Sequence, residues 1–117
     1  DHPNHFKNLI QDLKGAKQPV AFVSGDIHYS EITRVEESLL GYETYELTSS
    51  PIHSFIYRRK KGPEKWHNNP RRMVSVREHS YMLVDSQVKE GGLDLEIQAL
   101  GVKQKEPYFK RELKIRK

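Results

Sequence analysis

A short apolar run that ends in Ser24, Gly25 and Asp26, with His28 two residues later, is the part of this sequence best suited to chemistry. Residues 20–23 are unbroken apolar residues, typical of a strand covered on both faces. Open α/β sheets place their sites just past the carboxyl ends of such strands, and Gly25 permits a tight turn with close backbone approach. Asp26 offers a carboxylate oxygen and His28 an imidazole nitrogen, a pair suited to divalent or trivalent first-row metals. We therefore predict that both bind metal, or that one binds while the other orients it.

A plainer interpretation of the same residues stays open. An aspartate at the end of a strand often caps a turn through its own backbone hydrogen bonds. A Gly-Asp-x-His match by itself is a weak pattern with many accidental occurrences.

Other residue types that could contribute to a site are scattered along the chain. Ser24, Tyr29 and His53, together with Arg58 and Arg59, are candidates for lining a substrate pocket. His2 and His5 lie three residues apart and could share one face of a helix end, while His79 is expected in a strand. The Gly-x-Ser-x-Gly pattern of a serine nucleophile is absent around Ser24.

A basic segment supports a second hypothesis. Residues 58–72 include seven Lys or Arg residues and one acidic residue, Glu64, so their local charge is +6. Because the net charge of the chain is +4, the remaining residues carry −2. Tyr57 and Trp66 are interleaved with these cations, so the segment could hold phosphates and stack bases of a nucleic acid. The alternative is a solvated surface loop that, in an enzyme, attracts an anionic substrate.

Composition limits the class of protein. The chain has 117 residues, enough for one compact domain, with 35% hydrophobic and 31% charged residues and a mean hydropathy of −0.82. The absence of cysteine excludes disulfides, cysteine zinc sites and a thiol nucleophile. No apolar stretch approaches the roughly 18 residues of a membrane span.

The patterning predicts an α/β fold with an N-terminal helix, a buried strand, and then mixed and antiparallel strands. Apolar residues at helical spacing predict a helix over about residues 4–15, with Asn4 as N-cap and Gly15 as its left-handed end. Short strands are expected at 20–23, 32–35 and 43–48, with a turn at Gly41 between the last two. A long basic loop follows over about 49–73. An antiparallel meander is expected over 74–116, with a hairpin turn at residues 89–92.

Three segments resemble the PhoD-like alkaline phosphatases and phosphodiesterases. Residues 22–32 (FVSGDIHYSEI) are similar to the last metal-site motif of that family, in which an apolar strand ends in Gly-Asp-x-His. Residues 45–50 (YELTSS) resemble the strand that follows, and residues 79–85 (HSYMLVD) resemble the next core strand. The opening helix also has its counterpart, so the resemblance covers nearly the whole chain in the same order.

The resemblance implies the second half of a four-layer αββα metallophosphoesterase sandwich, residues 1–117 forming a single C-terminal segment. It implies a binuclear centre of Fe, Mn, Zn or Ca that hydrolyses phosphate mono- or diesters, with His28 as ligand and Asp26 as ligand or its neighbour. The family's other ligands come from upstream motifs that have no match before Val20. We therefore expect the chain alone to be inert, to need the upstream half of the same enzyme, and to self-associate through uncovered sheet edges. Relatives of this type are often periplasmic or extracellular.

Overall fold

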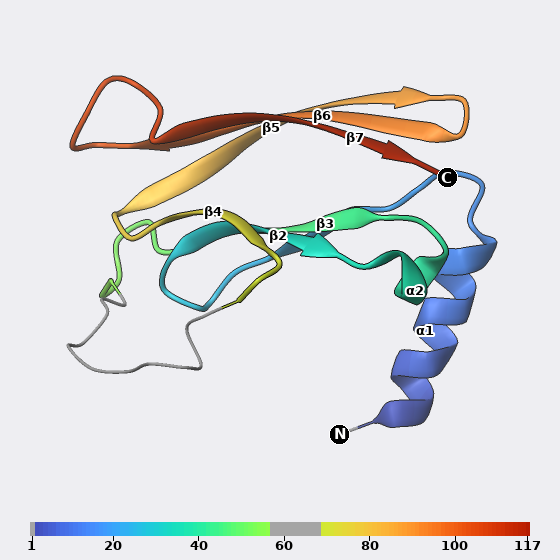
Figure 1. The fold of residues 1–117 in the computed structure, drawn as a ribbon. Coiled ribbons are helices and arrows are strands. Elements are labelled where there is room, and N and C mark those ends of the chain that lie inside the picture. The colour runs from blue at the N-terminus through green and yellow to red at the C-terminus, as the bar shows by residue number, and fades with distance from the viewer. Residues whose placement is uncertain (1, 57–68) are drawn as a thin grey trace.

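Two β-sheets face each other in the computed structural model, which describes residues 2–56 and 69–117 (Figure 1). The first sheet has the strand order β1-β3-β2-β4 and the second the order β5-β6-β7. Helix α1 (Pro3–Gly15) lies at one end of the two layers, beside the short helix α2 (Glu37–Leu40) (Figure 1). The predicted α/β class, with one N-terminal helix and mixed and antiparallel strands, is therefore confirmed.

The predicted first helix is present, but its two ends differ from the prediction. The N-cap is His2 and not Asn4, because Pro3 occupies the first turn, where its fixed φ favours helix initiation and its missing N–H costs no bond. Gly15 is still helical, and the chain leaves the helix through Ala16 in an extended conformation. Of its apolar side chains only Ile10 is buried, and Leu13 packs partly against the core. The second half of α1 therefore contacts the rest of the protein.

The first sheet joins β1 (Phe22–Ser24) in parallel to β3 (Thr44–Thr48), which pairs antiparallel with β2 (Ser30–Val35). Strand β4 (Arg72–Val76) pairs with β2 and completes the sheet. Regular structure after the long loop therefore begins two residues earlier than the predicted Val74. The expected turn at Gly41 has φ 88° and ends the one-turn helix α2, which the sequence pattern did not indicate. Residues 57–68 of the expected loop lie outside the described residues.

The expectation that the first strand is covered on both faces was wrong. Strand β1 is at the edge of its sheet, and the side chain of Val23 is 77% exposed. An unbroken apolar run is equally compatible with an edge strand whose outer residues have no covering element among those described. No described helix is both long and apolar enough to cross a bilayer.

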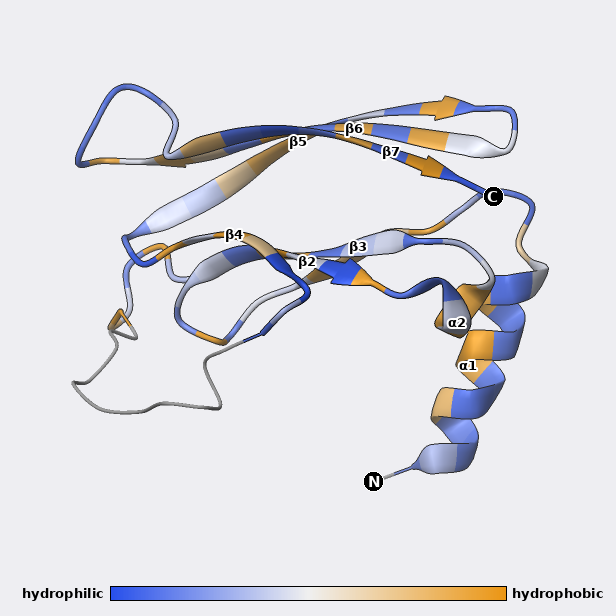
Figure 2. Cartoon of the chain, viewed as in Figure 1, coloured by the Kyte–Doolittle hydropathy of each residue, from blue (hydrophilic) through white to orange (hydrophobic). Residues whose placement is uncertain are grey.

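The second sheet is a three-stranded antiparallel meander of β5 (Ser80–Lys89), β6 (Gly92–Gly101) and β7 (Phe109–Arg116), as predicted. It begins at Ser80 and not at Val74, because residues 74–76 pair with β2 in the first sheet. The register pairs Lys89 with Gly92, so the hairpin turn is the two-residue loop Glu90–Gly91, with Gly91 at φ 61°. Hydropathy alternates along β6 and β7 (Figure 2), and their buried apolar side chains form one core cluster with those of the first sheet. The core gathers there: Ile32, Leu47, Leu95, Ile97, Ala99, Phe109, Leu113 and Ile115.

Strand β5 has apolar side chains exposed on both faces. Tyr81 and Leu83 are 48% and 47% exposed on one face, and Val88 on the other is 65% exposed. The strand pairs with β6 on one side only. At the start of its other edge Ser80 N and Met82 N donate to Pro51 O and Ser49 Oγ, and no described strand pairs with the remainder of that edge. This is the kind of edge for which self-association was predicted, and that association stays a prediction.

A glycine in β6 makes a close approach that leads to a stability prediction. A Cβ at Gly101 would lie 2.6 Å from both the His79 carbonyl oxygen and the Tyr108 ring, neither of which is the free end of a flexible chain. We expect Gly101→Ala to lower the free energy of unfolding by about 1–3 kcal/mol, the usual cost of overpacking. Urea unfolding followed by circular dichroism measures it.

Gly92→Ala is the matched control at the other end of the same strand. Its Cβ would lie 2.7 Å from Arg116 Nη1, but that guanidinium ends a flexible side chain that can move away. A loss of stability equal to that of Gly101→Ala would contradict the steric explanation.

Candidate functional site

The turn that follows β1 has an uncommon backbone. Asp26 has φ 71° and His28 has φ 62°, both in the left-handed region that L-residues seldom occupy. Such conformations concentrate at ligand and active sites. Gly25 is not among the positive-φ residues, and an added Cβ would meet only Ser49 O at an ordinary 3.5 Å. The close backbone approach expected at Gly25 is therefore not needed, and the strained positions are the two candidate ligands.

The imidazole of His28 is oriented by a neighbouring segment. Its Nδ1 lies 2.7 Å from the carbonyl oxygen of Phe55, and the two rings pack at 4.9 Å between centroids. A carbonyl only accepts, so Nδ1 carries the proton and the neutral ring has its lone pair on Nε2. No hydrogen-bond partner of Nε2 is found among the described residues. This arrangement is typical of metal-binding histidines, whose second nitrogen donates to a carbonyl.

The segment that holds His28 is itself fixed between the sheets by serines. Ser30 Oγ donates to Ser50 O (3.2 Å) and lies 3.0 Å from Ser80 Oγ, both serine side chains being buried. Ser49 Oγ accepts from Met82 N at 3.1 Å, and Ser80 N donates to Pro51 O at 3.0 Å. These bonds give Ser49 and Ser50 a structural role: they fix the start of the segment that leads to the Phe55 carbonyl.

The other histidines take different positions. His79 precedes β5 and so does not lie in a strand as predicted, because its Nε2 donates to Ser54 O at 2.7 Å and holds it in the connection between the sheets. His2 and His5 stack at 5.1 Å on one helix face, as their spacing predicted. His53 is exposed in the segment after β3. Asp26 is exposed as well, whereas His28 is half-buried.

Among the remaining pocket candidates, the Ser24 hydroxyl is already hydrogen-bonded to side chains of the neighbouring strand. Its Oγ donates to Glu46 Oε1 at 2.8 Å and lies 2.9 Å from Thr48 Oγ1, both on the adjacent strand β3. Arg58 and Arg59 lie outside the described residues, as do Tyr57 and Trp66.

Tyr29 is the centre of a charged cluster that the sequence did not reveal. The guanidinium carbons of Arg72 and Arg77 lie 5.7 and 5.4 Å from the centroid of its ring. Arg72 Nε also donates to Glu31 Oε2 at 2.5 Å in a pair whose side chains are only 18% and 10% exposed. Burial opposes the charge of Arg72, yet the hydrogen bond and charge of Glu31 outweigh it and raise the pKa of Arg72. The positive charge of Arg72 is therefore balanced by the carboxylate of Glu31. Arg77 differs, because its Nη1 is buried and has no hydrogen-bond partner among the described residues.

The residues present fit a metal only in part. His28 and Asp26 offer one nitrogen and one carboxylate on the same turn, the mixed donor set that first-row metals accept. The described part of the chain holds no group of three or more His, Asp or Glu side chains that could enclose a metal ion. Further ligands of a closed site therefore have to come from elsewhere.

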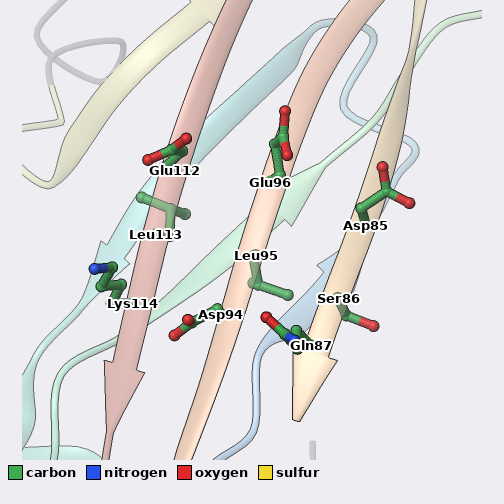
Figure 3. Close-up of a pocket in the computed structure, with 9 residues that line it drawn as sticks. All are labelled: Asp85, Ser86, Gln87, Asp94, Leu95, Glu96, Glu112, Leu113 and Lys114. Atoms are coloured by element: carbon green, nitrogen blue, oxygen red, sulfur yellow. The ribbon is translucent and has the colours of Figure 1, made fainter. Parts of the chain in front are cut away.

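Two depressions among the described residues lie away from this turn. One of about 350 Å³ lies on the second sheet, where Figure 3 shows Asp85, Glu96 and Glu112 in one row across the three strands. Their carboxylates are directly opposite one another in register, and their negative charge disfavours an anionic substrate. Another, of about 490 Å³, includes Arg34 and Arg71 in its lining. Both of these guanidinium groups already contact carboxylates, of Glu43 and Glu36 respectively.

Comparison of the chain with protein-family models, with curated proteins and with solved structures gave no match. The site itself is a strand-end turn with one oriented imidazole, one carboxylate and a neighbouring cluster of arginines around a tyrosine.

Proposed function

We propose that this chain supplies His28, with Asp26 beside it, to the metal centre of an enzyme that hydrolyses phosphate esters. The observation that carries the proposal is the orientation of His28: Nδ1 donates to the Phe55 carbonyl, which leaves Nε2 as the metal-binding atom. The left-handed turn supports it, since two strained residues bring both donors to the end of β1.

The chemistry follows from the donors and from the substrate class. Divalent or trivalent ions such as Fe, Mn, Zn or Ca at this turn would polarise a phosphoryl oxygen and lower the pKa of water. His28 holds its place through the Phe55 carbonyl, and the exposed Asp26 is free to approach the same ion. The remaining ligands would come from the upstream half of the same enzyme. We therefore expect the chain by itself to bind metal weakly and not to hydrolyse phosphoesters.

Metal binding at His28 is tested by amide NMR of the 117-residue chain titrated with Mn²⁺ and Zn²⁺. We use a His2→Ala/His5→Ala background, because that stacked pair is a competing ligand set. The amides of residues 25–29 are expected to broaden with Mn²⁺ and shift with Zn²⁺. In His28→Ala the response should fall at least about tenfold, since one carboxylate alone holds these ions poorly.

His53→Ala is the matched control, because it removes an exposed imidazole from the segment after β3 and leaves His28 in place. Unchanged amides in the parent, or an equal response in His28→Ala, would refute the proposal. A chromogenic phosphodiester assay with the same variants completes the test. Hydrolysis that is lost in His28→Ala would mean that the chain assembles a working site unaided.

The nucleic-acid hypothesis gains no support from the described part of the basic segment. Arg71 contacts Glu36 at 2.7 Å, and Arg72 contacts Glu31. Arg72 is held by a buried carboxylate, which makes it a poor phosphate ligand. Arg71 forms only a solvated pair, which contributes little, and residues 58–68 of the segment lie outside the described residues.

A further inference from the structure

We propose that Arg77 binds a phosphoryl oxyanion beside the candidate metal ligand, with Tyr29 holding its guanidinium in place. This inference rests on the proposed function for its setting, because it assigns the substrate's charged group to a second residue of the same site. Its own observations are the register of β2 and β4, the contacts of the guanidinium and the buried atom Nη1.

The register places Arg77 at the same end of the first sheet as His28. Strands β2 and β4 are antiparallel, and Ser30 pairs with Val76. Extending the ladder by one residue sets Tyr29 opposite Arg77, which agrees with the 5.4 Å between the guanidinium carbon and the ring centroid. Tyr29 is the chain neighbour of His28, so the cation lies at the same end of the sheet as the two candidate metal ligands.

The two arginines on the Tyr29 ring are not equivalent. Arg72 is neutralised by Glu31, to which its Nε donates at 2.5 Å. The contact found for Arg77 is the face of the ring, which attracts a cation without cancelling its charge. The cluster of Glu31, Arg72 and Arg77 therefore keeps one net positive charge, and Arg77 carries it.

The nitrogen Nη1 of Arg77 is an orphaned donor. It is buried, and it has no hydrogen-bond partner among the described residues. A guanidinium has several N–H donors and no acceptor, so such a group is satisfied only by an oxygen acceptor that is brought to it. Leaving the donor unpaired is unfavourable in the folded state. Because Arg77 is only half-buried as a residue, a small turn of its guanidinium brings this donor to an arriving acceptor.

A phosphoryl group matches a guanidinium that has no carboxylate partner among the described residues better than other anions do. Its several oxygens accept the forked donors of a guanidinium pairwise, and its charge complements the remaining positive charge of the cluster. A phosphate ester and free orthophosphate share this group, one as substrate and the other as product. Both are therefore expected to bind at Arg77.

The test follows the arginine Nε–Hε signals of the ¹⁵N-labelled 117-residue chain during titration with orthophosphate, without metal and at constant ionic strength. The Arg77 signal is expected to move saturably, and phenyl phosphate should move it in the same direction if the ester binds as the free ion does. Arg77→Lys is expected to weaken binding about tenfold, because an ammonium lacks the fork.

Arg111→Lys is the matched control. Arg111 lies 5.9 Å over the ring of Phe109 in the second sheet, so it is also an arginine on an aromatic face, but it is exposed. An Arg77 signal that stays unmoved by phosphate, or that moves equally with chloride, would overturn the inference. Because no metal is added, this outcome is independent of the Mn²⁺ and Zn²⁺ titration at His28.

Discussion

Replacing Arg72 with leucine is expected to lower the free energy of unfolding by about 3–5 kcal/mol, the usual cost of removing one partner from a buried ion pair. The change leaves the Glu31 carboxylate, 10% exposed, without the guanidinium that donates to it at 2.5 Å. It also removes one of the two cations from the ring of Tyr29. Urea unfolding at neutral pH measures the loss.

The matched control is the adjacent residue. Arg71→Leu breaks an ion pair of similar length, 2.7 Å to Glu36, whose side chains are 53% and 57% exposed. Solvated pairs contribute about 1 kcal/mol or less, so Arg71→Leu should be nearly neutral. Adding Glu31→Leu to Arg72→Leu should restore part of the stability, because an apolar pair leaves no buried charge. Equal losses at positions 71 and 72 would refute the distinction between them.

Ile97→Ala is expected to cost about 2–5 kcal/mol, as large-to-small changes in a packed core do. Ile97 is fully buried in β6, the central strand of its sheet, and faces the first sheet. Removing its branched side chain leaves a cavity that two paired sheets cannot readily collapse. The measurement is again equilibrium unfolding in urea.

Val84→Ala is the control for Ile97→Ala, since Val84 pairs directly with Ile97 on the same face of the meander. It is a β-branched residue as well, but it lies on the edge strand and is 39% exposed. We expect a loss of about 1 kcal/mol, in proportion to the smaller apolar area removed from water. A loss as large as that of Ile97→Ala would mean that the edge of β5 is covered in solution.

The elements that could be predicted from the sequence are those with a local cause. The helical spacing of apolar residues predicted α1, and the strict alternation from Leu93 to Ala99 predicted the central strand of the meander. Lys89 to Gly92 gave the hairpin turn, because Gly91 takes the positive φ that the loop requires. Two predictions failed for different reasons. Pro3 moved the helix start, which is a local effect, whereas the edge position of β1 is set by the strand order of the sheet and cannot be seen in an apolar run.

For the site, the sequence by itself indicated that Asp26 and His28 follow the first strand in a turn, because Gly-Asp ends the apolar run. It did not indicate that these two residues, and not Gly25, take the left-handed conformation. Tertiary structure alone decided the rest. Phe55 meets His28 because buried serines fix the segment after β3, and Arg77 meets Tyr29 because β4 pairs with β2 across a separation of nearly fifty residues. Such partners are set by strand register and packing. Neither leaves a periodic signal in the residues around it, so neither could be read along the chain.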